Sequence, residues 1–323
     1  MFGSEQRLLT HLRAFSRVSL IIGAFISLPI QFLFPNQTSW QVVLAIVALA
    51  VGIPHGAMDH TVTVPKMASP RMLLFVVGYL AVTALAVWFI LSQNVFGFQL
   101  VVLMSALHFG FGDAAFLAEL DARGANRGFP KILYALAAGF TPVGIPLVNS
   151  QSQQALSLVN ANLIGWAADL APTLFAALVI LNLSAAAILV LRGFKSQALD
   201  LLLLLTLAVL APPLVAFAFY FGFWHALRHT GRLSLELRTA TAAHAANQPG
   251  RAFWLTVLPG LPALALVIVA AAVMVAFNGL NFKADFLWYL LVVIWALTVP
   301  HMALTSRLDM RALGLLPRAR NDV

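Results

Sequence analysis

The chain has 323 residues, of which 61% are hydrophobic and only 9% are charged, and its mean hydropathy is +0.92. This composition excludes an ordinary soluble globular protein and predicts a polytopic membrane protein, with residues 1–323 forming a single integral membrane domain. The formal net charge of +8 comes from Lys and Arg residues in short loops between apolar runs, which indicates membrane topology rather than a nucleic-acid partner. The sequence contains no cysteine, which excludes disulfides, thiolate ligands and iron–sulfur clusters.

Apolar runs long enough to cross a bilayer follow one another along the chain. The first, 18–34, comes after three arginines as in a signal peptide, but its length and the lack of a cleavage pattern predict a retained span. Further spans are predicted at 41–59, 72–91, 96–120, 132–148, 170–191, 255–277 and 286–304. The expected fold class is all-α, a polytopic membrane helix bundle of about 8–10 helices.

The segment 199–230 is too long for one simple span and too short for two, and Pro212-Pro213 divides it. Basic residues alternate between loops in a way that places the amino terminus in the cytoplasm. The alternation continues to the carboxyl terminus only if 199–230 begins and ends on the same side. We therefore expect a broken or re-entrant element hinged at the two prolines, with both termini cytoplasmic in a multi-pass protein of the cell inner membrane.

Within that element the run 220–230, YFGFWHALRHT, contains two histidines four residues apart. On a helix His225 and His229 project from one face, which is a spacing that suits metal ligands. Short motifs of this kind also occur by chance, and an isolated helical histidine is more often a hydrogen-bonded core residue.

Four further histidines fall within or at the ends of predicted spans: His55, His60, His108 and His301. Ionisable groups are costly in a bilayer and usually face the interior of a bundle, so each is a candidate functional residue. The predicted topology places all six near the cytoplasmic side, which favours one shared site over six separate structural histidines. His11 and His244 lie outside the spans and are expected to be surface residues without a role.

Acidic and aromatic residues flank these histidines. Asp59 lies four residues after His55, and Asp113 follows His108 closely, so each carboxylate is expected to orient the neighbouring imidazole. A helix cap or a partner for arginine is the alternative for both aspartates. Five aromatic residues near the histidines are candidates for substrate binding, although lipid-facing or packing positions are the alternative: Phe109, Phe111, Tyr220, Phe223 and Trp224.

A set of imidazole ligands suits Zn, Cu, Fe or Ni. Zinc hydrolases usually add a catalytic Glu, and the predicted spans contain no HExxH motif and no evident Ser-His-Asp set. Redox chemistry at iron with dioxygen, on an apolar substrate dissolved in the membrane, fits the residues better.

The motifs PHGAMDH, HFGFGD, FWHALRH and VPHM together resemble the Brp/Blh family, membrane enzymes of bacteria and archaea that cleave β-carotene at its central double bond to two retinal molecules. The resemblance runs from about Gly52 to Met302. It implies an all-helical non-haem Fe(2+) dioxygenase that takes its carotenoid from the bilayer, uses dioxygen as co-substrate and has a functional link to a rhodopsin. Carried over by motif, the iron ligands are His55, His108, His225 and His229, with Arg228 also matching. His60 and His301 remain candidates for either direct ligands or supporting residues.

Two alternatives to this enzyme remain. One is a di-iron membrane desaturase or hydroxylase acting on a lipid, which the absence of HxxHH clusters disfavours. The other is a non-enzymatic membrane protein that handles a carotenoid or retinal.

Overall fold

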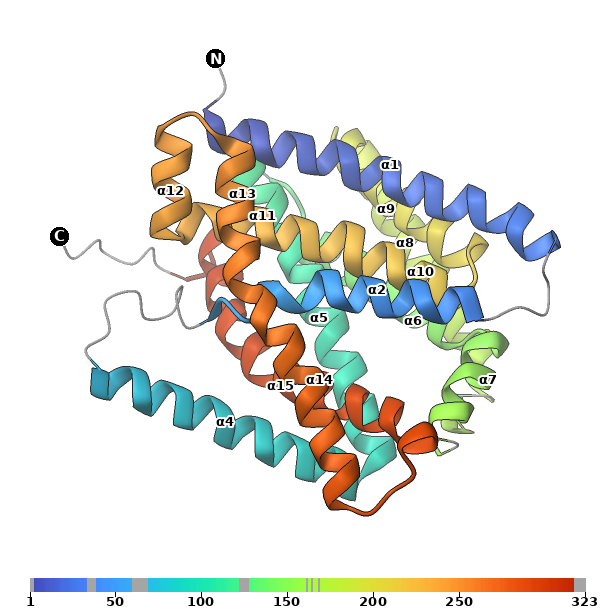
Figure 1. Cartoon of the computed structure of the whole chain (residues 1–323). Helices are drawn as coiled ribbons and strands as arrows, with labels where there is room; N and C mark the ends of the chain where they lie inside the picture. The colour runs from blue at the N-terminus through green and yellow to red at the C-terminus, as the bar shows by residue number, and fades with distance from the viewer. Residues whose placement is uncertain are drawn as a thin grey trace.

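The computed structural model describes residues 3–33, 39–59, 69–121, 128–160, 162–163, 165–167 and 169–316. Within these ranges every regular element is a helix, so the predicted all-α class is confirmed (Figure 1). The α-helices are α1 (Ser4–Leu33), α2 (Ser39–Gly56), α4 (Ser69–Ser92), α5 (Asn94–Leu120), α6 (Lys131–Leu147), α7 (Ser150–Val159), α8 (Ala171–Leu191), α9 (Lys195–Leu210), α10 (Pro213–Tyr220), α11 (Leu227–Glu236), α12 (Arg238–Ala245), α13 (Pro249–Val257), α14 (Leu261–Phe277) and α15 (Phe282–Ala312). Short 3-10 helices lie at Gly165–Ala167 and Leu258–Gly260, and a π-helix at Phe221–Ala226 joins α10 to α11.

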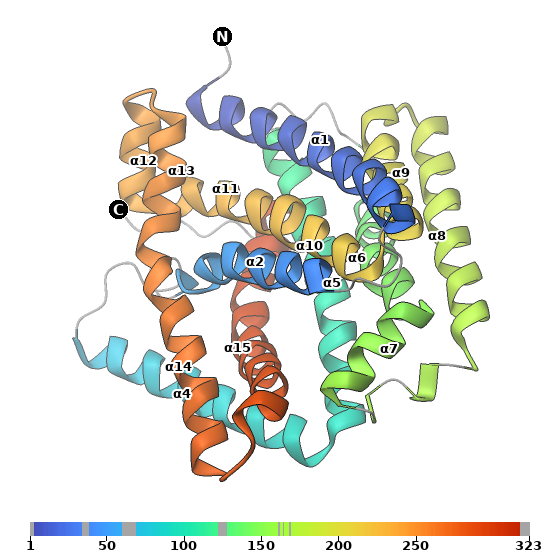
Figure 2. The same ribbon diagram turned by 45° about the vertical axis from the view of Figure 1, so that its right-hand side comes forward.

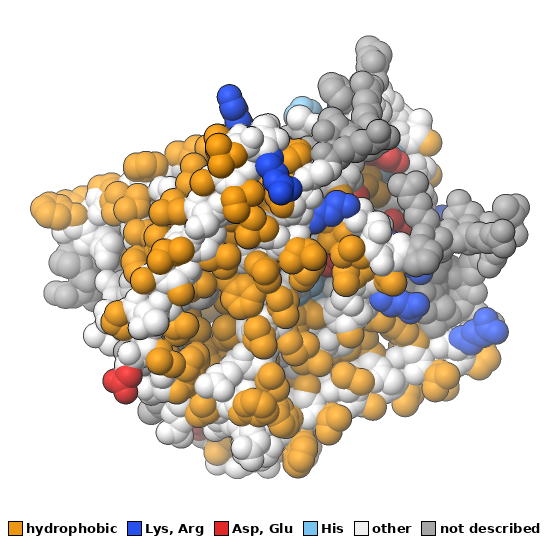
Figure 3. Space-filling view, turned by 180° about the vertical axis from the view of Figure 1, so that it is seen from behind, with side chains coloured by type: hydrophobic (Ala, Val, Ile, Leu, Met, Phe, Trp, Pro, Cys, Tyr) orange, Lys and Arg blue, Asp and Glu red, His pale blue; other side chains and the backbone are white. Residues whose placement is uncertain are grey.

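Six stretches of helix in the described chain are long and apolar enough to cross a membrane: α1, 70–92 within α4, α5, α8, the joined run of α13 and α14, and 285–312 within α15. Many large hydrophobic side chains are exposed on the outside of the bundle, and they are spread over the face that Figure 3 shows. Phe32, Leu191 and Phe277 are each at least 85% exposed, which would be costly in water and is expected in lipid. These features describe a multi-pass membrane protein.

The first helix is longer than the predicted span 18–34, because its basic start is part of the helix. Arg13 and Arg17 both reach the buried carboxylate of Asp200 on α9, at 2.7 Å and 2.6 Å. Sequence reasoning had placed these arginines in a segment before the membrane. Their ion pairs instead attach the amino-terminal half of α1 to the bundle.

The predicted break at Pro212-Pro213 is confirmed. Ala211 and Pro212 each precede a proline and are extended, with ψ values of 147° and 145°, because a proline ring disfavours the helical conformation of the residue before it. The helical run then restarts at Pro213 and passes through the π-helix into α11. Figure 2 shows this run beside α2, with α5 and α15 crossing behind it, so that four parts of the chain meet in the middle of the molecule.

Two glycines set the spacing between α5 and α6. A Cβ atom on Gly110 would lie 1.9 Å from the carbonyl oxygen of Ala135, and one on Gly139 would lie 1.9 Å from the carbonyl oxygen of Ala106. Only glycine permits backbones to approach this closely. The contact fixes the position of α5 within one turn of His108.

Candidate active site

Five buried histidines come together where α2, α5, α15 and the run from α10 to α11 meet. His55 lies in the last turn of α2, His108 in α5, His225 in the π-helix, His229 in α11 and His301 in α15, and each is 3–7% exposed. The separations between neighbouring ring centroids range from 5.0 Å for His108 and His225 to 5.9 Å for His108 and His229. The structure therefore places all four histidines predicted as ligands in one group with His301, and the tighter cluster of ring nitrogens within it consists of His55, His229 and His301. His60 lies outside the described residues.

A π-helix carries the first of the paired histidines. Its wider turn is uncommon and occurs mostly at functional sites. The rings of His225 and His229 are 5.8 Å apart and nearly parallel, with an interplanar angle of 12°. Spacing in the sequence had predicted the common face, but nothing in the spacing predicted the π-helix.

Several imidazole nitrogens in the group have no hydrogen-bond partner among the described residues, although all are buried. They are Nδ1 of His55, Nε2 of His108, His225 and His301, and both ring nitrogens of His229. Leaving a buried polar atom unpaired costs about 1–3 kcal/mol, so this concentration of unpaired nitrogens needs an explanation.

A metal ion bound by these nitrogens would explain them. The structure places one ring nitrogen from each of His55, His229 and His301 within 4.8 Å of the other two. Two nitrogens bound to the same ion at about 2.1 Å are at most about 4.2 Å apart, so the cluster is close to the width that a metal requires. Neutral imidazole is a ligand for iron among other transition metals, and the donor set fits such an ion.

Hydrogen bonds orient two of the rings. Nδ1 of His301 lies 2.9 Å and 3.0 Å from the two carboxylate oxygens of Asp59. The hydroxyl of Thr305 donates to the carbonyl of His301 at 2.9 Å, so its oxygen is free to accept from Nδ1 of His108 at 3.3 Å. In both rings Nδ1 makes the orienting hydrogen bond, and Nε2 remains available to a ligand at the centre of the histidine group.

The predicted partner of Asp59 was wrong, because α2 ends at Gly56 and the four-residue helical relationship to His55 is lost. The predicted role of Asp113 was also wrong. It follows His108 by five positions, about 140° around a helix, so its side chain points elsewhere. Its carboxylate accepts from Arg228 at 2.8 Å and from Trp224 at 2.9 Å, which is the alternative of an arginine partner.

Arg232 connects the histidine-bearing helices from the other side. Its guanidinium donates to Asp309 on α15 at 2.5 Å and to Glu119 on α5 at 2.8 Å. The side chain of Arg232 is only 4% exposed. This pair of contacts holds α5, α11 and α15 together one turn beyond His229.

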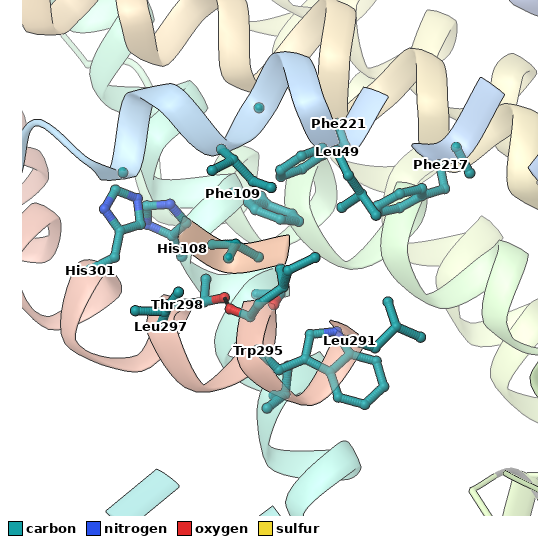
Figure 4. A pocket seen from close by; sticks show the side chains of 18 of the residues that line it. Leu49, His108, Phe109, Phe217, Phe221, Leu291, Trp295, Leu297, Thr298 and His301 are labelled. Atoms are coloured by element: carbon teal, nitrogen blue, oxygen red, sulfur yellow. Dashed lines mark hydrogen bonds between the residues drawn. The ribbon is translucent and has the colours of Figure 1, made fainter. Parts of the chain in front are cut away.

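A cavity of about 700 Å³ opens from the histidines into the space between the helices (Figure 4). His55, His108 and His301 form part of its wall, and most of the other wall residues are apolar. They come from helices α2, α4, α5, α6, α7, α10, α14 and α15 and from the π-helix. Such a cavity suits a large apolar molecule.

Two of the five aromatic residues predicted to bind substrate, Phe109 and Tyr220, line the cavity. Phe111, Phe223 and Trp224 are not among the described residues of its wall, and each packs within the bundle instead. Helical rotation explains the difference, because residues one or two positions apart point in different directions. Sequence reasoning missed other wall residues, shown in the close view: Leu49, Phe217, Phe221, Trp295 and Thr298.

The two histidines outside the predicted spans, His11 and His244, differ in their exposure. His11 is exposed, as predicted. His244 is only 5% exposed, so its predicted surface position was wrong. Its ring nitrogens lie 3.1 Å from the hydroxyls of Ser4 and Ser234, and it connects α12 to α1 and α11.

Comparison with known proteins agrees with this geometry. The chain is 27% identical over 190 residues to a beta-carotene 15,15'-dioxygenase from uncultured marine bacterium 66A03, an alignment that covers 55% of this chain and 64% of that relative. The chain thus matches less than two thirds of the relative's length. No solved structure matches the chain significantly. The family model described as beta-carotene 15,15'-dioxygenase matches residues 46–309, a range that contains all five clustered histidines, and the chain belongs to this family.

Proposed function

We propose that this protein cleaves the central double bond of β-carotene with dioxygen to give two molecules of retinal, at an Fe(2+) ion held by His55, His108, His225 and His229. The observation that carries the proposal is a group of five buried imidazoles with unpaired nitrogens, three of which lie in the wall of a large apolar cavity. Family membership supports the same chemistry.

The overall reaction balances without a further reductant. The carbon–carbon double bond and the bond of dioxygen both break, and each retinal receives one oxygen atom as its aldehyde. The iron, when bound, supplies the activation of dioxygen that no side chain in the cavity wall can provide. The residues of the chain supply the positions of the reactants and exclude water.

The wall of the cavity is suited to holding a polyene. Phe109 packs against His225 with ring centroids 4.2 Å apart, and Phe217 stacks on Phe221 at 5.4 Å with an interplanar angle of 6°. These rings line an apolar stretch of the cavity that leads to the histidines. Binding energy along that stretch would place the central bond of a long substrate beside the imidazoles.

Both alternative functions are less well supported. A di-iron desaturase or hydroxylase needs ligands for two ions, and the one cluster found among the described residues, His55, His229 and His301, can serve a single ion. A non-enzymatic carotenoid- or retinal-handling protein gives no reason for so many unpaired imidazole nitrogens. Iron content separates the three possibilities: about one ion per chain, about two, or none.

The same proposal includes the membrane location and the orientation of the enzyme. We place both termini on the cytoplasmic side of the cell inner membrane, since loop charge favours that orientation. Substrate enters from the bilayer, and retinal released there is available to a rhodopsin.

Expression in cells that make β-carotene tests the proposal directly. Cells with the wild-type protein should lose their colour and accumulate retinal, and cells with His55→Ala, His108→Ala, His225→Ala or His229→Ala should stay coloured. His11→Ala is the control, because that side chain is exposed and is not part of the cavity wall. Retinal formation by any of the four variants at the wild-type level would refute the assigned ligand set.

A further inference from the structure

We propose that His301 is a fifth imidazole ligand of the same metal ion, and that Asp59 and Tyr79 are its positioning residues. This inference rests on the proposed function, because it concerns the ion that the other four histidines would hold.

His301 lies beside three of the four histidines identified by motif. Its ring centroid lies 5.2 Å from that of His55, 5.2 Å from that of His108 and 5.6 Å from that of His229. One of its nitrogens belongs to the cluster that spans no more than 4.8 Å with His55 and His229. A residue that only supported a ligand would lie behind it, whereas His301 lies beside three of them and faces the cavity.

The hydrogen bonds of His301 determine which nitrogen is available. The carboxylate of Asp59 can only accept, so Nδ1 of His301 carries the proton and Nε2 carries a lone pair. That lone pair is buried and has no partner among the described residues. A carboxylate behind a histidine in this way fixes the tautomer and strengthens the imidazole as a ligand.

An ion pair between Asp59 and a doubly protonated His301 is the structural alternative. It would leave an N–H at Nε2 buried without an acceptor and directed at other imidazoles. A metal ion at the centre removes that cost, because Nε2 then shares its lone pair. The unpaired nitrogen therefore favours a ligand over an ion pair.

Tyr79 holds Asp59 from the other side. Its hydroxyl lies 3.2 Å from a carboxylate oxygen of Asp59 and 3.3 Å from the carbonyl oxygen of Leu297, one turn before His301. The hydroxyl has one proton, which the two acceptors share. Tyr79 thereby connects α4 to Asp59 and to the turn of α15 that precedes His301. Gly56 lies against the imidazole, since a Cβ atom there would be in van der Waals contact with Nδ1 of His301 at 3.5 Å.

Five imidazoles leave one position on a six-coordinate ion, which is sufficient for a small molecule such as dioxygen. The inference thus predicts a more crowded metal centre than the four motif histidines would form. It also gives the carboxyl-terminal part of the chain a role in metal binding.

The test is metal binding by full-length protein in detergent, measured with Co(2+) and Fe(2+) in competition with a chelator. His301→Ala should weaken binding by about 100-fold or more, as expected for a lost ligand, and Asp59→Asn by about 10–100-fold, as expected for a lost support. Tyr79→Phe should have a smaller effect than Asp59→Asn. The visible spectrum of bound Co(2+) reports its coordination, and it should change in His301→Ala but keep its form in Tyr79→Phe.

His11→Ala is the matched control, a histidine replaced on an exposed helix face. If His301→Ala fails to fold, His301→Gln and Asp59→Asn provide the same comparison with a polar side chain retained. Wild-type affinity and an unchanged Co(2+) spectrum in His301→Ala, with loss of binding in His55→Ala, would overturn this inference and leave the proposed function standing. Absence of metal binding by the wild-type protein would instead overturn the proposed function itself.

Discussion

Arg228 and Asp113 form an ion pair of 2.8 Å in which both side chains are almost fully buried, at 2% and 3% exposed. Arg228 lies between His225 and His229 in the sequence, but its guanidinium contacts Asp113 and Ser16. The central carbon of its guanidinium lies 3.2 Å from the ring centre of Trp224, whose N–H also donates to Asp113. The helical run thus contributes His225 and His229 to the histidine group, and it places an arginine between them in the core.

We expect Arg228→Ala to destabilise the protein by about 3–5 kcal/mol, because removing one partner leaves the carboxylate of Asp113 buried and uncompensated. Arg228→Lys should also be destabilising, since an ammonium group cannot reproduce the planar contacts of the guanidinium. Thermal unfolding in detergent measures both effects. Arg251→Ala is the control, because that arginine is exposed and its side chain bonds to the nearby Gln248. An unfolding temperature for Arg228→Ala equal to that of the control would show that the pair is not structural.

Two phenylalanines on α5 provide a matched test of the cavity. Both contact the main hydrophobic core, but Phe109 also lines the cavity and contacts His225, whereas Phe111, two positions further on, is not among the described residues of the cavity wall. Phe109→Ala should lower kcat/KM for carotenoid cleavage by about 10-fold or more, as expected for lost apolar contact with a substrate. Phe111→Ala should lower the unfolding temperature with little change in kcat/KM of the folded fraction. Equal kinetic losses in the two variants would mean that the cavity does not hold the substrate.

Replacing either of two helical glycines by alanine should change the stability of the protein, but in opposite directions. Gly110→Ala places a methyl group against the backbone of α6 and should destabilise the bundle by about 1–3 kcal/mol or more. Gly78 lies in α4, where a Cβ atom would meet nothing within 4 Å, so Gly78→Ala should stabilise its helix by up to about 1 kcal/mol. Unfolding curves of the two variants, recorded in the same detergent, show whether each substitution raises or lowers the stability. A Gly110→Ala protein as stable as wild type would show that α5 and α6 can separate without cost.

His244 makes the stability of the α1–α12 contact depend on pH. Burial lowers the pKa of His244, and the nearby carboxylate of Glu5 opposes this only in part. The hydroxyl of Ser234 donates to a backbone carbonyl and accepts from Nε2, which leaves Nδ1 to accept from Ser4 and favours the neutral ring.

The sign of the effect follows from the lowered pKa. The unfolded chain takes up its proton near pH 6.5, before the folded one does, so this contribution to stability is complete above that pH and is lost as the pH falls below it. Unfolding temperatures measured from pH 7.5 to 5 should therefore decline less steeply in His244→Gln than in the wild type, and His11→Gln should follow the wild type. A wild-type slope in His244→Gln would contradict this assignment.

The sequence was sufficient for the helical class, the break at Pro212-Pro213 and the gathering of the histidines, because each depends on a local rule. Apolar length, the missing proline N–H and the cost of polar groups in lipid need no knowledge of distant contacts. The partners of Asp59 and Asp113 were missed for the opposite reason. The direction of each carboxylate depends on where α2 ends and on how α5 is rotated about its axis. Tertiary packing determines both. His244 was misplaced because a helix outside the membrane can still be covered by another.

The distance along the chain between Asp59 and His301, 242 residues, has a consequence for how the protein is made. At a typical synthesis rate of 5–20 residues per second, α15 follows the end of α2 by about 12–50 seconds. During that interval the earlier imidazoles are in the membrane without the last one. With His301 as the proposed fifth ligand, we expect metal loading at full affinity to be a late event in biogenesis, after α15 has inserted. A ribosome-bound chain that lacks α15 should release its ion to a chelator that the finished protein resists.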